Sequence, residues 1–544
     1  MHWISEFRRK VKADEISDKG FSFLRKATAN WQLLGSALSL LSPSLFDSNP
    51  AAACTSLQHD LDLSSLNTTI LSAAYYNNAT EVITLGSCPP ATTKIGDPLC
   101  RVQLIVNTSD ISAVTAEAWL PTEWNGRFLG LGNGGLGGCI DYDNLGYGSS
   151  MGFATIGTNN GHDGNTGLPF ANNPESLASG LQQPTTGRVP HHAYYLGCSA
   201  GGRQGMYSAM YNPGDFDGIL AGAPTTNFNH LMGASAIVTK YIGAPHPESS
   251  ASFIPLALWD IIMAEMLRQC DAFDGVKDGI ISEPDACEFR PEEIQCTGRT
   301  TSDCLTIAQV VALRNIYSPL YGFNGELLFP RFDPGAALQM SLFSGAPFKY
   351  SDHWMKYAIH NDSEYDYSAI GLADIALADE IDPGKISTFN GDLSAFRARG
   401  GKLISYHGRS DQYIPSGNAK ALYNHVSRTL RLPASSLDAF YRLFLVPGMG
   451  HCFGGPGAVN FGQHARSMPR APDETLEENK ENKMSEKAAT HKTNNVLLSL
   501  VDWVERGLAP DTITGVSDDG KSTRVHCRYP QKSVWDGGEY ICVP

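Results

Sequence analysis

The chain has 544 residues, of which 42% are hydrophobic, so it can form one large domain or two to three ordinary ones around a sizeable core. This composition excludes a chain that is disordered throughout. There are 41 lysines and arginines against 56 aspartates and glutamates, a net charge of −15 that repels phosphate backbones and anionic lipids. We therefore expect neither nucleic acid nor a membrane as a partner.

Residues 1–53 are expected to be a leader that contains a signal peptide. A mostly apolar run, 31–41, follows two basic residues and leads to three alanines that end at Ala53, as in a secretory signal with its cleavage site. The run is too short and too interrupted by Gly and Ser to span a membrane. The long charged segment before it is unusual and is compatible with a start codon placed too early. An ordinary surface helix is the alternative interpretation.

Sequons and cysteines agree with an extracellular location. N-glycosylation sequons begin at Asn67, Asn78, Asn107 and Asn361, so we expect N-glycans. The twelve cysteines are an even set without any CxxC spacing, which favours disulfides over a zinc site. The protein is therefore predicted to be secreted into an oxidising environment.

Short apolar runs that end in Gly or polar turns recur along the chain and are typical of buried parallel strands. They cover 114–120, 127–131, 153–158, 193–196, 219–221, 402–406 and 440–446. Helical stretches follow at least three of them, at 202–211, 416–428 and 494–506. This alternation of strands and helices predicts an α/β fold.

A second domain is expected to be inserted at residues 225–395, where the strand rhythm stops and an aromatic-rich segment contains two closely spaced cysteine pairs. The α/β core would then consist of residues 54–224 and residues 396–544. Within the second part, residues 472–490 carry many charges and almost no large apolar residues. They are predicted to be a mobile surface insertion rather than part of a site.

Two G-x-S-x-G sequences are candidates for the turn that carries a serine nucleophile. In 197–201 a strand precedes Ser199 and a helical run follows, which is the order found in α/β-hydrolases. In 148–152 a polar segment precedes Ser150 and a strand follows, so we treat this match as a decoy. Gly makes up a tenth of the chain, and a Gly-rich turn is therefore the alternative interpretation of either match.

Candidate partners follow Ser199 in the order that this fold requires, acid before base. Asp411 lies just past the predicted strand 402–406, and His451 lies just past the predicted strand 440–446. Each alone is an ordinary loop residue, but together with Ser199 they predict a catalytic triad. The backbone N–H groups of Ala200 and Gly134 are predicted to form the oxyanion hole.

The segments around these residues resemble the fungal tannase and feruloyl esterase family. The resemblance extends from about residue 53 to the C-terminus and rests on GCSAGGRQG at Ser199, HGRSDQYIP at Asp411 and PGMGHCFGGPG at His451, with RFLGLGNGG and GLAPDTITG. It implies an α/β-hydrolase core with a lid domain. It also implies a disulfide between Cys198, directly before the nucleophile, and Cys452, directly after the catalytic histidine.

The remaining cysteine pairs are inferred from the resemblance and from their proximity in sequence. We expect disulfides between Cys54 and Cys100, Cys88 and Cys139, Cys270 and Cys287, Cys296 and Cys304, and Cys527 and Cys542.

An acidic loop in the expected lid is a candidate calcium site. Asp271, Asp274 and Asp278 supply hard oxygen ligands, and Val276 and Ile280 can add backbone carbonyls. The spacing differs from that of an EF-hand, so a solvated acidic turn is equally compatible with the residues alone. The family resemblance implies that the loop binds a structural calcium ion.

The resemblance implies a secreted serine carboxylic ester hydrolase that releases ferulic or related phenolic acids from plant cell-wall esters through an acyl-enzyme. Tannase activity on galloyl esters, and hydrolysis of other aromatic esters, remain open. A non-catalytic secreted glycoprotein that binds phenolics is the alternative from another class. It is disfavoured because no residue of the predicted triad is missing.

The connection between the predicted strands 153–158 and 193–196 departs from the family. It contains four prolines, five glycines and hardly any apolar periodicity, so a full crossover helix is not expected there. We infer that the chain lacks a segment of about 20 residues at this point, through an error in the gene sequence or its splicing. One face of the strand before Ser199 should then be uncovered.

Overall fold

The computed structural model describes residues 49–77, 79–84, 88, 92–173, 175, 192–298, 303–337, 342–469 and 494–544. Most of the leader, the sequon at Asn78 and the insertion 472–490 lie outside these ranges. The described part begins with helix α3 (Pro50–Asp60), which Asn49 caps by accepting a hydrogen bond from the Ala52 N–H. Cleavage after Ala53 would therefore remove the first turn of a helix.

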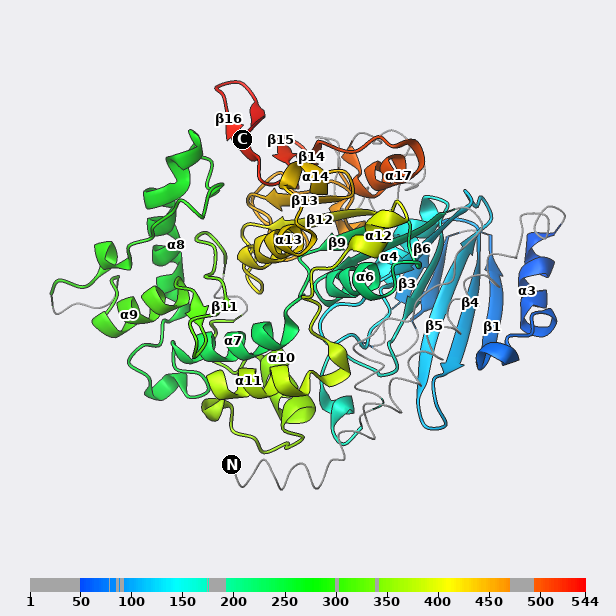
Figure 1. The fold of residues 1–544 in the computed structure, drawn as a ribbon, viewed down its shortest axis with the longest axis horizontal. Helices are drawn as coiled ribbons and strands as arrows, with labels where there is room; N and C mark the ends of the chain where they lie inside the picture. The colour runs from blue at the N-terminus through cyan, green and yellow to red at the C-terminus, as the bar shows by residue number, and fades with distance from the viewer. Residues whose placement is uncertain are drawn as a thin grey trace.

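A nine-stranded sheet in the order β1-β4-β5-β7-β6-β8-β9-β12-β13 forms the centre of the molecule (Figure 1). Adjacent strands run parallel from β7 to β13 and antiparallel from β1 to β7. The strands are β1 (Thr68–Tyr76), β4 (Leu99–Asn107), β5 (Ala113–Pro121), β6 (Arg127–Leu131), β7 (Ala154–Thr158), β8 (His192–Cys198), β9 (Gly218–Gly222), β12 (Lys402–Gly408) and β13 (Tyr441–Val446).

All seven predicted strands are present, but the expected direction of one of them is wrong. The run 114–120 belongs to β5, which pairs antiparallel with both β4 and β7. Only residues 108–112 connect β4 to β5. Such a short connection makes a hairpin, because a parallel crossover needs a dozen or more residues.

Helices cover both faces of the sheet, because side chains of successive strand residues point to opposite sides. On β12, Leu403 packs into one hydrophobic core and Ile404 into the other. The first core includes residues of α6 (Ala200–Tyr211), α12 (Ser394–Ala398), α13 (Gly417–Leu430) and α14 (Ala434–Leu437), and the second includes residues of α4 (Tyr142–Ser150) and α17 (Val496–Arg506). The three predicted helices are thus α6, α13 and α17.

The expected uncovered face of β8 is not observed. Tyr195 is fully buried against Phe216 and the first turns of α6, while Tyr194 is fully buried against Phe153 on the opposite face. The Tyr194 hydroxyl also donates a hydrogen bond to Glu505 of α17 at 2.8 Å. The connection between β7 and β8 lies partly outside the described residues, so the missing segment stays a prediction. Its expected consequence, an uncovered face of β8, is wrong, because helices from other parts of the chain cover the strand.

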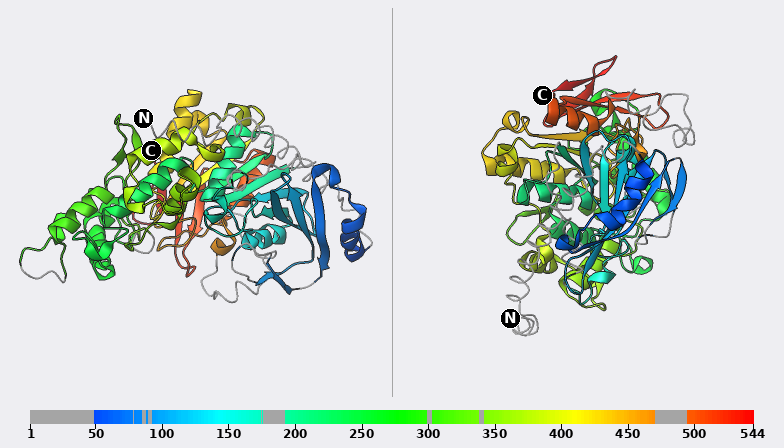
Figure 2. Two further views of the ribbon diagram at one scale, coloured as in Figure 1. Left: turned by 90° about the horizontal axis from the view of Figure 1, so that it is seen from below. Right: turned by 90° about the vertical axis from the view of Figure 1, so that its right-hand side faces the viewer.

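A third hydrophobic core lies among the helices between β9 and β12. These elements gather at the end of the molecule opposite β1 and α3 (Figures 1 and 2). They comprise α7 (Phe228–Lys240), α8 (Leu256–Cys270), α9 (Ile307–Ile316), α10 (Lys349–His353), the π-helix η8 (Trp354–Ile359), α11 (Leu372–Ile381) and the short hairpin β10 (Leu320–Tyr321) with β11 (Leu327–Phe329).

Disulfides and short hairpins complete the described chain. All twelve cysteines are paired, and the six pairs are the expected ones. No helix in the described ranges is long and apolar enough to cross a membrane. The remaining two-stranded sheets pair β2 (Thr80–Ile83) with β3 (Thr92–Ile95), β14 (Thr512–Val516) with β15 (Thr523–Cys527), and β16 (Lys532–Trp535) with β17 (Tyr540–Val543).

Candidate active site

Ser199 occupies a sharp turn between β8 and α6. Its backbone has φ 63° and ψ −124°, a conformation that non-glycine residues rarely adopt. The Ser199 N–H donates to the carbonyl of Gly222 at 2.9 Å, and its carbonyl accepts from Arg203 N–H at 3.0 Å. These bonds hold the strained turn, which presents the serine at the carboxyl end of the sheet as a nucleophile elbow does.

The glycines after Ser199 are required by close backbone approaches. A Cβ on Gly202 would lie 2.2 Å from the carbonyl oxygen of Gly222, and a Cβ on Gly201 would lie 3.0 Å from the carbonyl carbon of Gly132. Both contacts involve backbone atoms that cannot move aside easily. The sequence S-A-G-G therefore reflects how tightly α6 packs against the ends of the neighbouring strands.

The other match, around Ser150, has no such geometry. Ser150 is the last residue of α4, and its hydroxyl donates to the carbonyl of Tyr147 at 2.9 Å. The segment before it, interpreted from the sequence as polar, is helical and carries the buried Leu145 and Tyr147 into the core. Ser150 thus ends a helix instead of starting one.

Asp411 and His451 meet on the loops that follow β12 and β13. The His451 Nδ1–H donates to Asp411 Oδ2 at 2.8 Å, and Asp411 Oδ1 accepts from the N–H groups of Tyr413 and Ile414 at 2.8 and 2.9 Å. Asp411 is fully buried. Burial by itself would raise the pKa of the Asp411 carboxyl. The neighbouring His451 and His407 outweigh this effect and hold the pKa well below its ordinary value. Asp411 is therefore ionised and able to orient the imidazole.

His407 is a partner of Asp411 that the sequence analysis missed. It lies on β12, fully buried, with Nε2 2.9 Å from the carbonyl of Ile414 and 3.3 Å from Asp411 Oδ2. Since a carbonyl only accepts, Nε2 carries the proton. The spacing of four residues in HGRSD was the only available signal, and nothing in the sequence places both side chains on the same side of the strand end.

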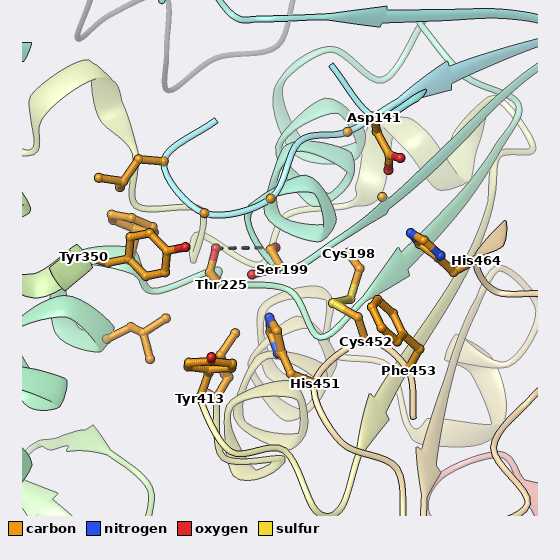
Figure 3. Close-up of a pocket in the computed structure, with 18 of the residues that line it drawn as sticks. Asp141, Cys198, Ser199, Thr225, Tyr350, Tyr413, His451, Cys452, Phe453 and His464 are labelled. Atoms are coloured by element: carbon orange, nitrogen blue, oxygen red, sulfur yellow. Dashed lines mark hydrogen bonds between the residues drawn. A yellow bond between two sulfur atoms is a disulfide. The ribbon is translucent and has the colours of Figure 1, made fainter. Parts of the chain in front are cut away.

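Ser199 and His451 face the same cavity. The imidazole of His451 turns a nitrogen-bearing edge toward Ser199 (Figure 3). Within the described residues we find no hydrogen bond between the Ser199 hydroxyl and His451, as is common for such pairs before substrate binds. The structure thus brings together the three residues of the predicted triad, with the serine contact still open.

The Cys198–Cys452 disulfide joins the residue before Ser199 to the residue after His451, across 254 residues of sequence. It lies in the wall of the cavity directly beside both side chains (Figure 3). The bond therefore fixes the turn of the candidate nucleophile relative to the loop of the candidate base.

The loop after β6 lies where the second oxyanion donor is expected. The Asn133 N–H is already used, since it donates to Gln204 Oε1 at 3.1 Å. Gly134 lines the cavity, and a Cβ there would meet nothing within 4 Å. Ala200 is the first residue of α6, where backbone N–H groups have no partner within the helix. Ala200 and Gly134 therefore remain the candidate donors.

The cavity has a volume of about 280 Å³ and two chemically different ends on either side of Ser199 (Figure 3). The end beside the helices between β9 and β12, which we call the lid, is apolar and aromatic, and the other end is more polar. The first is lined by Leu136, Phe228, Leu231, Met232, Phe348, Tyr350, Tyr413 and Ile414, and the second by Asp141, Asn144, Phe453, Gln463 and His464. Such a cavity suits an ester with one aromatic and one hydrophilic part.

The acidic loop 271–280 follows α8, and two of its carboxylates share a backbone donor. Asp271 accepts from the N–H groups of Gly279 and Ile280, and Asp278 accepts from the same Ile280 N–H at 3.0 Å and from the hydroxyl of Tyr540 at 3.0 Å. In the described ranges no three His, Cys, Asp or Glu side chains lie close enough to hold one metal ion. The three aspartates are thus not gathered around one point.

Two features of this loop nevertheless fit a cation. Asp274 Oδ2 is buried without a hydrogen bond, and the nearest positive charge is Arg524, 3.7 Å away. Burial, together with the neighbouring charge of Asp274, raises the pKa of Asp278. Carboxylate and carbonyl oxygens are the ligands that calcium prefers, so Asp274 and Asp278 fit its chemistry.

Comparisons with known proteins agree with the fold. A family model described as tannase and feruloyl esterase matches residues 100–365 and 375–543. The chain is 40% identical over 515 residues to a probable feruloyl esterase B of Aspergillus clavatus, covering 90% of this chain and 93% of that protein.

Solved structures give the same result. The structure is similar to the crystal structure of feruloyl esterase B from Aspergillus oryzae, with a TM-score of 0.82, 36% identity and coverage of 91% of this chain and 100% of the other. It also shares the fold of tannin acyl hydrolase from Aspergillus niger, with a TM-score of 0.66, 19% identity and coverage of 92% and 95%. The chain therefore belongs to the tannase and feruloyl esterase family, has an α/β-hydrolase fold and is a carboxylic ester hydrolase.

Proposed function

We propose that this protein is a secreted feruloyl esterase that releases ferulic and related hydroxycinnamic acids from plant cell-wall esters. The observation that carries the proposal is the hydrogen-bonded pair Asp411–His451 facing Ser199 across a cavity with an aromatic end. The names of the relatives, feruloyl esterase B in both the sequence and the structure comparison, support the choice of acid.

The reaction would proceed through an acyl-enzyme. Ser199 Oγ attacks the ester carbonyl while His451 Nε2 takes its proton, and the N–H groups of Ala200 and Gly134 stabilise the oxyanion. His451 then donates the proton to the departing alcohol oxygen. Asp411 holds the Nδ1–H tautomer and stabilises the imidazolium without taking the proton. Water, activated by His451, hydrolyses the acyl-enzyme and frees Ser199.

The two ends of the cavity support an assignment of the two parts of the substrate. The aromatic end beneath the lid would take the phenolic acyl group, because Phe348 and Tyr413 stack there with ring centroids 6.1 Å apart and offer apolar faces. The polar end beside Asp141 and His464 would take the alcohol, which in a cell-wall ester is a sugar. Both assignments agree with the position of Ser199 between the ends.

A tannase acting on galloyl esters is the second candidate, supported by the shared family. A panel of methyl ferulate, methyl caffeate, methyl gallate and a chromogenic short-chain ester, with Ser199→Ala as the inactive control, separates the possibilities. A feruloyl esterase gives its highest kcat/KM on the hydroxycinnamates. Preference for methyl gallate indicates a tannase, and no turnover of any ester indicates a non-catalytic binding protein.

Secretion and N-glycosylation are part of the same proposal. Six disulfides suit an oxidising compartment. Asn67, Asn107 and Asn361 are exposed. The Asn361 amide donates to Asn172 at 2.8 Å, so a glycan there would replace this bond. A mass shift on treatment of the secreted protein with an endoglycosidase tests the assignment.

We also propose that the acidic loop binds a structural calcium ion. The ligands would be the carboxylates of Asp274 and Asp278 and the backbone carbonyls of Val276 and Ile280. Asp271 would either shape the loop or bind the ion as a further ligand. The ion would neutralise the two carboxylates, of which Asp274 lies 3.7 Å from Arg524. Its role would be stability, because the loop lies outside the segments that carry the triad.

A further inference from the structure

Ser235, in the middle of lid helix α7, has an unusual hydroxyl group. The side chain is fully buried, it lines the cavity, and its Oγ has no hydrogen-bond partner in the described part of the chain. A buried polar group without a partner is destabilising unless a ligand completes it. The proposed function makes no use of this group.

Several other helix hydroxyls in the described chain bond to their own helix. Ser499 of α17 donates to the carbonyl four residues earlier at 3.0 Å, and Thr239, also in α7, donates to the carbonyl of Ala236 at 2.9 Å. This local bond is the usual solution for a serine within a helix. Ser235 does not make it, so its hydroxyl has no partner within its own helix or elsewhere in the described chain.

The position of Ser235 on α7 indicates how far its hydroxyl lies from the nucleophile. Phe228, Leu231, Met232 and Ser235 all line the cavity, and their spacing of three, four and seven residues places them on one face of α7. Ser235 is the only polar member of this face. The helix starts close to the nucleophile, since Thr225 N–H donates to the carbonyl of Ser199 at 3.2 Å.

This face of α7 therefore extends away from the ester bond that reacts. Ser235 lies about 10 Å farther along the helix axis than Phe228, because each residue of an α-helix rises about 1.5 Å. The walls around it are apolar and aromatic. Tyr350, whose hydroxyl accepts a hydrogen bond from Asn165 at 2.7 Å, and Tyr413 also line the cavity. A ligand group that reaches Ser235 must be polar and must stand at the end of a long, flat apolar unit.

We propose that Ser235 Oγ forms a hydrogen bond with the 4-hydroxyl group on the ring of the acyl part of the substrate, and thereby selects hydroxycinnamoyl esters. This inference rests on the proposed function and assigns recognition of the acyl group to Ser235. In a hydroxycinnamoyl ester two additional carbons separate the ring from the carbonyl, so its 4-hydroxyl reaches deeper than that of a galloyl ester. A site that requires this bond also disfavours the analogue without the hydroxyl, which leaves Ser235 unpaired.

The test compares Ser235→Ala with the wild type on two pairs of methyl esters that differ by one hydroxyl. The long pair is methyl p-coumarate and methyl cinnamate, and the short pair is methyl 4-hydroxybenzoate and methyl benzoate. We expect Ser235→Ala to lower the kcat/KM ratio of the long pair by about three- to tenfold, the range for one neutral hydrogen bond. The ratio of the short pair should not change. Ser499→Ala, which removes a serine with its local bond far from the cavity, should alter neither ratio.

Stability provides a second readout. Because the hydroxyl has no partner, Ser235→Ala should not lower the Tm, and the variant should fold. A lower Tm would show that the hydroxyl has a structural partner and would overturn the inference. An unchanged ratio for the long pair in the folded variant would overturn it too, while the proposed function would stand on wild-type turnover of methyl ferulate.

The remaining outcomes are equally decisive. A loss in the short pair instead of the long pair would contradict the reach argued for Ser235. Wild-type protein that cleaves a chromogenic short-chain ester but no hydroxycinnamate would overturn the proposed function and this inference with it.

Discussion

The candidate catalytic centre and the acidic loop of the lid are built in opposite ways. Ser199, Asp411 and His451 are separated by up to 252 residues, yet a disulfide and a set of buried hydrogen bonds hold their turns together. Asp271 and Asp278 are only seven residues apart and both accept from the Ile280 N–H, yet the three aspartates of the described loop are not gathered as a metal-binding group. Parallel strands end at one edge of a sheet, so their loops meet there whatever their distance in sequence. Neighbouring carboxylates repel each other and separate unless a cation gathers them.

The largest expected effect tests the difference between the two serine turns. Ser199→Ala should lower kcat by about 10⁶-fold, as loss of a nucleophile does, because no other group can attack the ester. Ser150→Ala, the matched change at the end of α4, should leave kcat nearly unchanged. Steady-state kinetics on methyl ferulate with both folded variants measure this. Equal losses would contradict the assignment of Ser199.

The disulfide offers the next test of how the catalytic centre is held. Replacing both Cys198 and Cys452 by Ala should lower kcat by up to about 10²-fold and change KM less, because the nucleophile and the base lose their relative position. The control replaces both Cys296 and Cys304, which close a loop of only eight residues in the lid. If both double variants lose kcat equally, the effect is one of general stability and not of position.

The acidic loop is tested by removing its proposed ion. A chelator should lower the Tm of the wild type, because an ion that binds only the folded state adds about 2.7 kcal/mol at a hundredfold excess over its Kd. Asp274→Ala should abolish this dependence, whereas Asp260→Ala, a change of an exposed acid on α8, should preserve it. Thermal scans with chelator and with added calcium measure the effect. A wild-type scan that is the same in both conditions would reject the site.

The smallest effect concerns the contact between the lid and the catalytic core. Asp285 accepts from Arg409 at 2.8 Å and also pairs with Lys420. Burial by itself would raise the pKa of Asp285. The two cations outweigh this effect and hold the pKa well below its ordinary value of 3.8. Its contribution to stability is therefore present above pH 3.8 and is lost as the pH falls below that value.

Asp285→Asn should accordingly be less stable than the wild type at pH 7, by less than about 1 kcal/mol because the carboxylate is half-exposed. The difference should shrink as the pH falls below 3.8, which denaturant unfolding at several pH values measures. A constant difference at all pH values would mean that the charge of Asp285 is not what stabilises the contact.

Elements with a strong apolar pattern could be predicted well. The strands and the helices α6, α13 and α17 have long buried stripes, so their periodicity is clear. The direction of β5 was wrong because periodicity carries no information about direction, and helix α4 was missed because its Gly and Ser residues weaken the helical pattern. The predicted triad residues do lie together, Asp411 bonded to His451 and Ser199 at the same cavity, since chain order and loop position are properties of the sequence.

Other functional features could not be predicted in this way. His407 next to Asp411 and the free hydroxyl of Ser235 depend on which side chains share a space. The cover of β8 was likewise misjudged, because helices from distant parts of the chain supply it.

The sequence by itself determined the α/β alternation, the order of the candidate nucleophile, acid and base, and the family, because these depend on local periodicity and on motifs of a few residues. Only the tertiary structure decided which groups are buried without partners, such as Asp274 Oδ2 and Ser235 Oγ, and which lid residues face Ser199. Burial and hydrogen bonding result from packing between segments far apart in the chain, and the sum of these contacts is not encoded in any single segment.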